Sequence, residues 1–418
     1  MYNNHKKGLR CHICTGCGRC PGIYPDSART GERNGLHVLT EGMGEGETGD
    51  VLKRDLGNLI TADIGTTTIA MVLYGEDGRK MDSFVCLNPQ IKYGADVISR
   101  IQAAEDPRSA SEMKLQVRQA LCRGIGQFRE RISGKEGLRM VIAANTTMVY
   151  LFMGWDTKEL GEAPFRASRL EAVRTELDGV ACYIFPGLSA FVGGDITAGI
   201  YACGMTDREE PTLLIDLGTN GEMALGSRSR VLACATAAGP AFEGGVNRGV
   251  WGSDMVSLLA RLRREGVLDE TGLLADPFFD TGIRIGDVCV TQQSVRAVQL
   301  AKGAIAAGIR ILAEAYGLSP DRIPRVVLAG GFGYYLNPED AACIGLLPGE
   351  LAGRTFAGGN TALAGARLVG MRFADSEAWI SGTENIFPKG CSVEIKNLAK
   401  EPDFEKWYLE SMDMRPLS

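Results

Sequence analysis

The sequence predicts an α/β protein of two related lobes, and three stretches of the chain carry this prediction. Residues 62–73 read as an apolar run, an Asp, a turn with Gly and Thr, and a second apolar run, which is typical of a strand, a tight turn and a returning strand. Residues 214–225 repeat this pattern in variant form. Residues 323–333 read as a strand of the buried type that ends in a cluster of glycines.

The two hairpins are suited to bind phosphate groups. Glycine in each turn lets backbone N–H groups approach an anion closely, and Asp63 and Asp216 can hold a divalent cation or its water ligands. A single Asp-x-Gly-Thr turn would be explained as an ordinary turn, but two copies favour a pair of turns that grip one polyphosphate from both sides. The expected phosphate contacts are Gly65, Thr66, Thr67, Gly218, Thr219 and Asn220.

Three such turns in this order resemble the two phosphate motifs and the adenosine motif of the acetate and sugar kinase, Hsc70 and actin superfamily. The resemblance implies a two-lobed actin-like ATPase fold, in which Mg²⁺ and ATP lie in a cleft between duplicated ribonuclease H-like lobes. It also implies that Gly330 and Gly331, in the glycine cluster, lie under the adenosine.

The composition fits two lobes with cores of their own. The chain has 418 residues, of which 45% are hydrophobic, and its net charge of −6 argues against a nucleic-acid or anionic-membrane partner. No apolar segment reaches about 18 residues and the N-terminus lacks a hydrophobic signal core, so we expect a soluble cytoplasmic protein. The expected division is a Cys-rich segment at 1–24, a flexible linker at 25–57, a first lobe at 58–210, a second lobe at 211–395 and a tail at 396–418.

A compact run near the N-terminus holds four of the twelve cysteines, namely Cys11, Cys14, Cys17 and Cys20. The run is close to the ferredoxin-type pattern and favours an iron–sulfur cluster, most simply [4Fe–4S]. Zinc is the rival, but its tetrahedral sites usually split two cysteine pairs across a longer loop. The last gap is two residues rather than three, so the first three cysteines are the safer ligands. The other eight cysteines are scattered, as expected of free thiols in a reducing compartment.

Three further residues are candidates for the same site. Asp195 follows a glycine pair at an expected helix start, where it is either an N-cap or a group that orients an attacking water. Glu243 lies in a turn of Gly, Pro and Ala and is a candidate on the nucleotide side. Lys302 interrupts a helical apolar stripe of residues 295, 298, 305, 309 and 312. It is either a snorkelling lysine or, by resemblance to actin-like ATPases, a contact to ribose or phosphate.

A narrower resemblance rests on a combination of phrases spread over most of the chain, at residues 88–90, 93–101, 145–148, 239–245 and 330–333. These phrases resemble those of the reductive activators of corrinoid proteins. The resemblance implies that ATP is used to return a cob(II)amide cofactor to cob(I)amide, with electrons relayed through an iron–sulfur cluster. It implies two partners, a corrinoid protein of a methyltransferase system and an electron donor, and it suggests a homodimer.

Three other functions are compatible with parts of this pattern. A small-molecule kinase of the same fold would use Asp195 as the base, but it has no need of the cysteine run. A nucleotide-dependent binding or assembly factor for a metalloprotein would transfer no electrons. An activator of a radical dehydratase would carry its cluster cysteines inside the ATPase domain, where this sequence has no such group.

Overall fold

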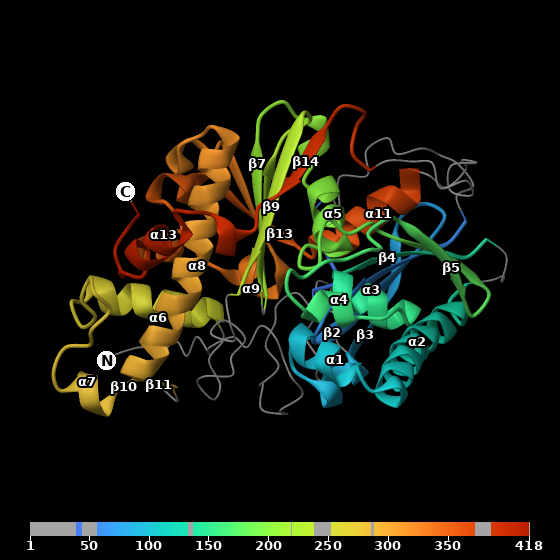
Figure 1. Cartoon of the computed structure of the whole chain (residues 1–418), viewed down its shortest axis with the longest axis horizontal. Coiled ribbons are helices and arrows are strands. Elements are labelled where there is room, and N and C mark those ends of the chain that lie inside the picture. Colours follow the sequence, from blue (N-terminus) through green and yellow to red (C-terminus); the bar gives the residue numbers. More distant parts are fainter. Residues whose placement is uncertain are drawn as a thin grey trace, which may run out of the picture.

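The fold is an α/β fold of two lobes, as the sequence predicts (Figure 1). The computed structural model of the chain describes residues 39–43, 57–132, 137–218, 220–237, 252–285, 288–372 and 386–417. Within these ranges, each lobe is built on one sheet of six strands.

The first sheet consists, in spatial order, of β3 (Lys80–Leu87), β2 (Thr68–Tyr74), β1 (Leu59–Ile64), β4 (Arg139–Ala144), β6 (Val180–Ile184) and β5 (Val173–Leu177). β1, β2 and β3 form an antiparallel meander, and β4 and β6 are added parallel to β1. β5 pairs antiparallel with β6 at the edge. The buried runs of β1 and β4 are those expected of strands covered on both faces.

The second sheet consists, in spatial order, of β13 (Thr355–Gly359), β12 (Arg325–Ala329), β7 (Thr212–Leu217), β8 (Gly221–Gly226), β9 (Arg230–Thr236) and β14 (Ser392–Ile395). β7, β8 and β9 again form an antiparallel meander, and β12 and β13 are added parallel to β7. Apart from their sixth strands, the two sheets share one topology. This repetition confirms the prediction of duplicated lobes, and it makes β1 and β7 equivalent strands.

Helices form the other layers of the described residues. They are α1 (Val97–Ala103), α2 (Pro107–Arg129), α3 (Thr146–Met153), α4 (Lys158–Gly161), α5 (Gly194–Ala202), α6 (Gly252–Arg264), α7 (Phe278–Thr281), α8 (Gln292–Tyr316), α9 (Gly330–Tyr335), α10 (Pro338–Cys343), α11 (Thr361–Arg372) and α13 (Phe404–Glu410). A small hairpin pairs β10 (Ile283–Ile285) with β11 (Val288–Val290). Short 3₁₀ turns cover Pro89–Tyr93, Met205–Asp207, Pro320–Arg322, Gly349–Arg354 and Leu398–Lys400.

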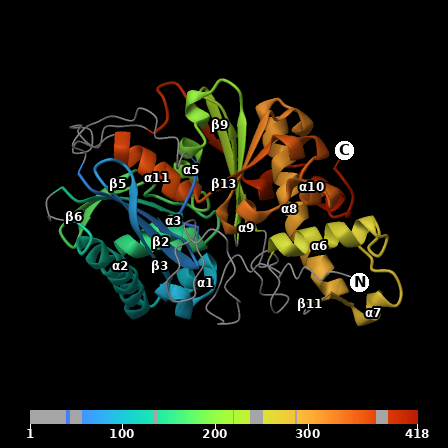
Figure 2. The same cartoon turned by 180° about the vertical axis from the view of Figure 1, so that it is seen from behind.

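Two helices, α5 and α11, lie between the sheets (Figures 1 and 2). One core cluster joins Ala198 of α5 and Leu363 of α11 to the first sheet, and another joins Ile196 and Ile200 of α5 to the second sheet. The outer faces are covered by α2 and α3 on the first sheet and by α6 and α8 on the second. Although α11 lies between β13 and β14 of the second sheet in sequence, it packs on β1 and β4, so the expected boundary at residue 210 does not divide the cores cleanly.

Helix α8 has the apolar stripe that the sequence predicts. It begins with a capping box made by Thr291 and Ser294 and ends at Gly317, whose backbone is left-handed. The stripe residues face the core, and each is at most 1% exposed: Val295, Val298, Ile305, Ile309 and Leu312.

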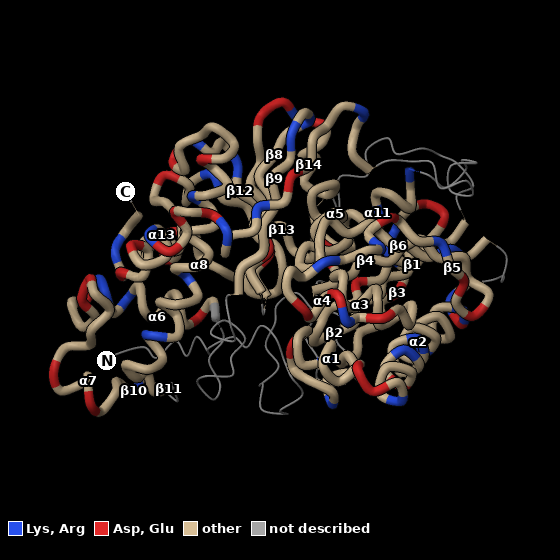
Figure 3. Tube along the Cα trace, in the orientation of Figure 1, with Lys and Arg blue, Asp and Glu red and all other residues tan. Residues whose placement is uncertain are grey.

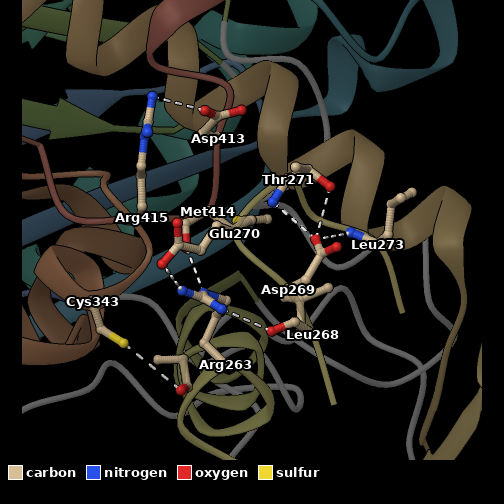
Figure 4. Close-up of polar contacts among 11 residues, drawn as sticks. Arg263, Leu268, Asp269, Glu270, Thr271, Leu273, Cys343, Asp413, Met414 and Arg415 are labelled. Carbon is tan, nitrogen blue, oxygen red and sulfur yellow. Dashed lines mark hydrogen bonds and ion pairs between the residues drawn. The ribbon is translucent and has the colours of Figure 1, made fainter. Parts of the chain in front are cut away.

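The C-terminal segment belongs to the second lobe rather than forming a separate tail. The guanidinium group of Arg263, on α6, donates to the carbonyls of Met414 and Leu268, and it lies 3.6 Å from the carboxylate of Glu270 (Figure 4). Met414 is fully buried in the core of the lobe. The packing of residues near 414 therefore completes the core of the second lobe.

Part of the expected linker is also packed against the lobes. Residues 39–43, here called the anchor segment, form an antiparallel bridge from Gly42 to Gly359 at the end of β13. Leu39 and Thr40 are buried. This stretch is therefore not a free tether.

Charged residues of both signs are mixed in both lobes (Figure 3). Among the helices that the structure describes, none combines the length and the apolarity needed to cross a membrane.

The close crossing of α5 and α11 gives a test of the fold. A Cβ atom at Gly365 would lie 2.0 Å from the Ala198 carbonyl oxygen, so we expect Gly365→Ala to lower the free energy of unfolding by about 1–3 kcal/mol. Gly126→Ala is the matched control, because Gly126 is an exposed position of α2 with open space around it and should gain about 0.5–1 kcal/mol. Denaturant unfolding measures both, and equal stability of the Gly365→Ala and parent chains would contradict the packing described.

Candidate functional site

The site is organised by two carboxylates at equivalent places in the two sheets. Asp63 lies near the end of β1, where it pairs with Ala143 of the parallel neighbour β4. Asp216 lies near the end of β7, where it pairs with Ala329 of the parallel neighbour β12. Both side chains are partly exposed, unlike the fully buried residues that precede them on their strands. The duplicated topology thus brings both predicted metal-holding residues to the corresponding edge of each sheet.

Asp195 joins these two carboxylates. The pKa of Asp63 and of Asp216 is raised from 3.8 to about 7, mainly by burial and in part by the nearby negative charge of Asp195. Burial also raises the pKa of Asp195 to about 6. Mutual repulsion requires the carboxylates to lie near one another. The structure therefore assembles all three predicted acidic residues.

Glu222 is a fourth carboxylate that the sequence reasoning missed. It lies at the start of β8, directly across the strand pair from Asp216. Burial raises its pKa well above 4.5, and the charges of Asp195 and Asp216 raise that pKa further. Two like charges placed opposite each other on a sheet are destabilising. The sequence contains a signal for this residue, which is a difference between the two repeats. The first hairpin has Ala70 opposite Asp63, whereas the second has a carboxylate at the equivalent position.

No Lys or Arg side chain in the described part of the chain forms an ion pair with any of these four carboxylates. The described residues also contain no group of three His, Cys, Asp or Glu side chains gathered closely enough to hold a metal ion directly. This arrangement fits Mg²⁺, which keeps several of its water ligands and is usually held by one or two carboxylates together with phosphate oxygens.

The turn between β1 and β2, with Gly65, Thr66 and Thr67, is held from one side through its carbonyl groups. The side chain of Asn88 donates to the Gly65 carbonyl at 2.8 Å, and the backbone N–H of Asn88 donates to the Thr67 carbonyl at 2.9 Å. Arg100 donates to the Thr66 carbonyl at 2.6 Å. In a trans peptide the N–H points opposite to the C=O, so the Thr66 and Thr67 amides face the other side. Amides turned in this way suit an anion.

Arg100 is a buried positive charge beside this turn. The residue is fully buried, and burial lowers its pKa to about 10 while the charge of Asp96 partly opposes that shift. Besides the Thr66 carbonyl, its guanidinium group donates to the Gly94 carbonyl at 3.0 Å. A buried cation is costly unless an opposite charge lies near it. A phosphate group on the far side of the turn would supply such a charge.

Asn145 connects the first turn to the start of α5, which carries Asp195. Its side chain caps α3 by accepting from the Met148 amide, and it also donates to the Thr66 hydroxyl at 3.2 Å. A Cβ atom at Gly193 would lie 2.4 Å from Asn145 Cα, so this glycine lets the start of α5 approach Asn145 closely. Asp195 is not the N-cap of α5, because Gly193 occupies that position and Asp195 lies in the first helical turn.

In the second lobe, the turn between β7 and β8 contains Gly218 and Asn220, and the Gly218 amide donates to the Asn220 carbonyl. The glycine cluster follows β12 and begins α9 with Gly330 and Gly331. Gly330 has a φ of +76°, and a Cβ atom there would lie 2.6 Å from Asp216 Oδ1. The third predicted motif thus lies directly against the second carboxylate.

Lys302 does not lie with these residues, which corrects the idea that it contacts a nucleotide. It is fully buried on α8, and its ammonium group donates to the carbonyls of Ser411 and Asp413 at 2.5 and 2.6 Å. Burial lowers its pKa to about 7. Its position gives it a structural role, in which it holds the C-terminal segment against α8.

The remaining predicted site residues lie outside the described residues, namely Thr219, Glu243, Cys11, Cys14, Cys17 and Cys20. The cysteines that the structure does describe are free and range from buried to partly exposed. They form no candidate metal site within the described ranges. An iron–sulfur cluster therefore has no candidate ligands among the described cysteines.

Family models match almost all of the chain beyond its N-terminal part. Residues 59–208 match the RACo middle region, and residues 210–248 and 246–416 match the C-terminal domain of RACo, described as the ASKHA domain. Their boundary near 209 agrees with the start of the second lobe just before β7.

Similar proteins bear related names. The corrinoid activation enzyme RamQ of Eubacterium limosum is 32% identical over 84% of this chain and 69% of its own length. A reductase of Methanosarcina barkeri, named for a Co(II) methylated amine-specific corrinoid protein, is 24% identical over 55% of each chain. A solved structure, a reductive activator for a corrinoid, iron–sulfur protein, has a TM-score of 0.73 and 28% identity over 87% of this chain and 67% of its own.

The raised carboxylate pKa values predict how stability depends on pH. A carboxyl group whose pKa is raised on folding costs stability as the pH rises from its ordinary value of 3.8 towards about 7. Asp216→Asn removes one such group, so without metal this variant should gain on the order of 1 kcal/mol or more relative to the parent at pH 8, with a smaller gain at pH 5. Thermal unfolding in a chelator measures the difference. The exposed control Asp280→Asn should follow the parent at both pH values, and an Asp216→Asn chain that does the same would contradict the burial of this carboxylate.

The support that Arg100 gives to the first turn predicts a loss of nucleotide affinity on substitution. Arg100→Lys keeps the charge but loses the fork that reaches both the Gly94 and Thr66 carbonyls, so the Kd for Mg-ATP should rise roughly tenfold, or about 1.4 kcal/mol. Calorimetry measures the Kd. Arg79→Lys is the control, since Arg79 is an exposed residue paired only with Asp77 among the described contacts. A folded Arg100→Lys chain with the parent affinity for Mg-ATP would contradict the claim that Arg100 supports the first turn.

Proposed function

The chain belongs to the RACo family, and from this membership we propose that it is an enzyme that uses ATP to return a corrinoid protein from the cob(II)amide to the cob(I)amide state. The observation that carries the proposal is the convergence of Asp63, Asp195 and Asp216 between two duplicated lobes. A kinase of the same fold would share these carboxylates. The relatives named as corrinoid activators favour reductive activation instead.

In the proposed complex, the triphosphate lies between the turns at residues 65–67 and 218–220. The inward-facing carbonyls of the first turn leave its amides available for phosphate oxygens, and the largely buried Asp63 and Asp216 face the hydrated Mg²⁺. Gly330 and Gly331 lie next to Asp216 and support the adenosine side. Binding of Mg²⁺ would relieve the repulsion among the carboxylates, which couples folding of the site to nucleotide binding.

Asp195 is suited to act as the general base in hydrolysis. A carboxylate with a pKa near 6 is mostly ionised at neutral pH, yet it is a stronger base than an ordinary aspartate. It would take a proton from water as the water oxygen bonds to the γ-phosphorus and the bond from that phosphorus to ADP breaks. Glu222 lies close enough to feel the charge of Asp195 and is the alternative base.

The free energy that nucleotide binding must supply for the uphill electron transfer is modest. For one electron, an uphill gap of about 200 mV corresponds to on the order of 5 kcal/mol. A nucleotide that binds two states of the protein with different affinity can shift their equilibrium by this amount. The two states are most simply two arrangements of the lobes around the nucleotide that they share. Helices α5 and α11 join the cores of the lobes and would link these arrangements.

The proposed redox part is an iron–sulfur cluster held by Cys11, Cys14 and Cys17, with Cys20 or another residue as the fourth ligand. When bound, the cluster would pass a single electron from an external donor towards the corrinoid. Its support is the spacing of the cysteine run. The corrinoid protein and the electron donor are the proposed partners, and a homodimer remains a prediction.

Reduction of a corrinoid protein under exclusion of oxygen tests the proposal. The full chain, a cob(II)amide protein and a strong reductant should give cob(I)amide absorbance only when Mg-ATP is added. Asp195→Asn should lower ATP hydrolysis and cob(I)amide formation about 10²- to 10⁴-fold while it leaves the Kd for Mg-ATP within a few-fold of the parent value. The exposed control Asp280→Asn should keep both rates.

Each other outcome identifies another function. Hydrolysis that is stimulated by the corrinoid protein without reduction of cobalt would indicate an assembly factor. Transfer of the γ-phosphoryl group to a small molecule would indicate a kinase. In the parent enzyme, the hydrolysis rate should fall as the pH drops below about 6, because Asp195 then takes up a proton. A rate that is independent of pH down to 5 would argue against Asp195 as the base.

A further inference from the structure

The anchor segment, residues 39–43, is attached to the second lobe through its backbone. The Met43 amide donates to the Gly358 carbonyl at 3.1 Å, and the Asn360 amide donates to the Glu41 carbonyl at 2.9 Å. Together with the antiparallel bridge from Gly42 to Gly359, these bonds pair the anchor segment with the end of β13. The segment is thus held by an ordered set of contacts.

Glycine on both sides makes this approach possible. A Cβ atom at Gly42 would lie 2.4 Å from the Asn360 carbonyl oxygen. A Cβ atom at Gly359, whose φ is +65°, would lie 2.5 Å from the Glu41 carbonyl oxygen. Any larger residue at either position would push the two backbones apart.

The first lobe also holds the anchor segment. Lys80, the first residue of β3, donates to the hydroxyl of the buried Thr40 at 2.9 Å and lies 3.6 Å from the carboxylate of Glu41. The anchor segment therefore contacts both lobes at once, and it would respond to a change in how the lobes sit against each other.

One side chain connects the anchor segment to the nucleotide site. The buried Asn360 amide group donates to Asp63 Oδ2 at 2.8 Å and to the Leu39 carbonyl at 3.3 Å. Its side-chain oxygen accepts from the Leu363 amide at 2.8 Å and so caps α11. Both hydrogens of the amide are in use, and they are shared between the site carboxylate and the segment.

We infer that Asn360 is a positioning residue that couples nucleotide occupancy to the hold on the anchor segment. Asp63 Oδ2 cannot be drawn towards a hydrated cation without a change in its bond to Asn360, and Asn360 is tied to the segment by its side chain and its backbone. The segment lies between the cysteine run and the first lobe in sequence, so the coupling reports the nucleotide state to the part of the chain that precedes it. This inference rests on the proposed nucleotide site, but not on the corrinoid reaction.

The coupling must be reciprocal, because a ligand that changes the hold on the anchor segment is itself changed in affinity by that hold. Damage to the anchor segment, at a distance from the phosphates, should therefore alter the Kd for Mg-ATP. Gly42→Ala makes such damage without removing any group of the nucleotide site.

Two variants separate the coupling from the cap of α11. Asn360→Ser keeps a side-chain oxygen that can cap the helix but removes the amide donor, and Asn337→Ser is the matched control. Asn337 caps α10 through the amides of Glu339 and Asp340, and among the described residues it forms no hydrogen bond with the site. We expect Asn360→Ser and Gly42→Ala each to change the Kd for a non-hydrolysed Mg-ATP analogue five- to twenty-fold in the same direction. The double variant should change it no more than the larger single one.

Hydrogen exchange of the full chain gives the second readout. Binding of the analogue should change the exchange rate of the amides in residues 39–43 at least three-fold in the parent and in Asn337→Ser, and this response should be lost in Asn360→Ser. Exchange that does not respond to the analogue in the parent chain, or additive effects of Gly42→Ala and Asn360→Ser on the Kd, would overturn the inference. A chain that binds the analogue and shows the coupling but reduces no corrinoid would contradict only the proposed function. A chain that binds no Mg-nucleotide would overturn both.

Discussion

The repulsion among four carboxylates at the meeting of the two lobes is the constraint on which the rest of this structure depends. Asp63, Asp195, Asp216 and Glu222 come from four elements, and burial raises the pKa of each. Such a group of like charges costs stability and persists only where the surrounding packing enforces it. The two sheets, the paired helices α5 and α11 and the glycines near Asp195 and Asp216 supply that packing. A hydrated cation with its nucleotide is the natural counter-charge.

The two lobes share a topology, but the contacts around their aspartates and turns differ. In the first lobe, Arg100 and Asn88 hold the turn after Asp63 through its carbonyl groups, and Asn360 holds the carboxylate itself. In the second lobe, the position opposite Asp216 carries Glu222, and a glycine takes the place of any holding side chain. Buried polar groups thus hold the first turn, whereas the second hairpin adds a carboxylate. The two lobes therefore have the same topology but different surroundings for their turns.

The sequence alone could predict the fold and the three acidic residues, because these depend on local patterns. Two Asp-x-Gly-Thr turns, with a glycine-ended strand after them, specify strand ends whose positions the duplicated topology then fixes. Lys302 was harder to place, since only the tertiary structure shows that the C-terminal carbonyls take up its donors. Arg100 stood within a stretch used for family resemblance, yet its buried role depends on a backbone turn far away in sequence. Asn360 could not be found, because its partners Asp63 and Leu39 lie hundreds of positions from it.

The position of the metal in a complex with nucleotide tests the account most directly. In crystals grown with Mn²⁺ and a non-hydrolysed ATP analogue, the anomalous signal of Mn²⁺ should lie between the turns at residues 65–67 and 218–220. The carboxylates of Asp63 and Asp216 should be within reach of its water ligands, and the triphosphate should face the Thr66 and Thr67 amides. A metal and triphosphate bound elsewhere, with these carboxylates still facing only one another and solvent, would contradict the claim that the two duplicated turns form the nucleotide site.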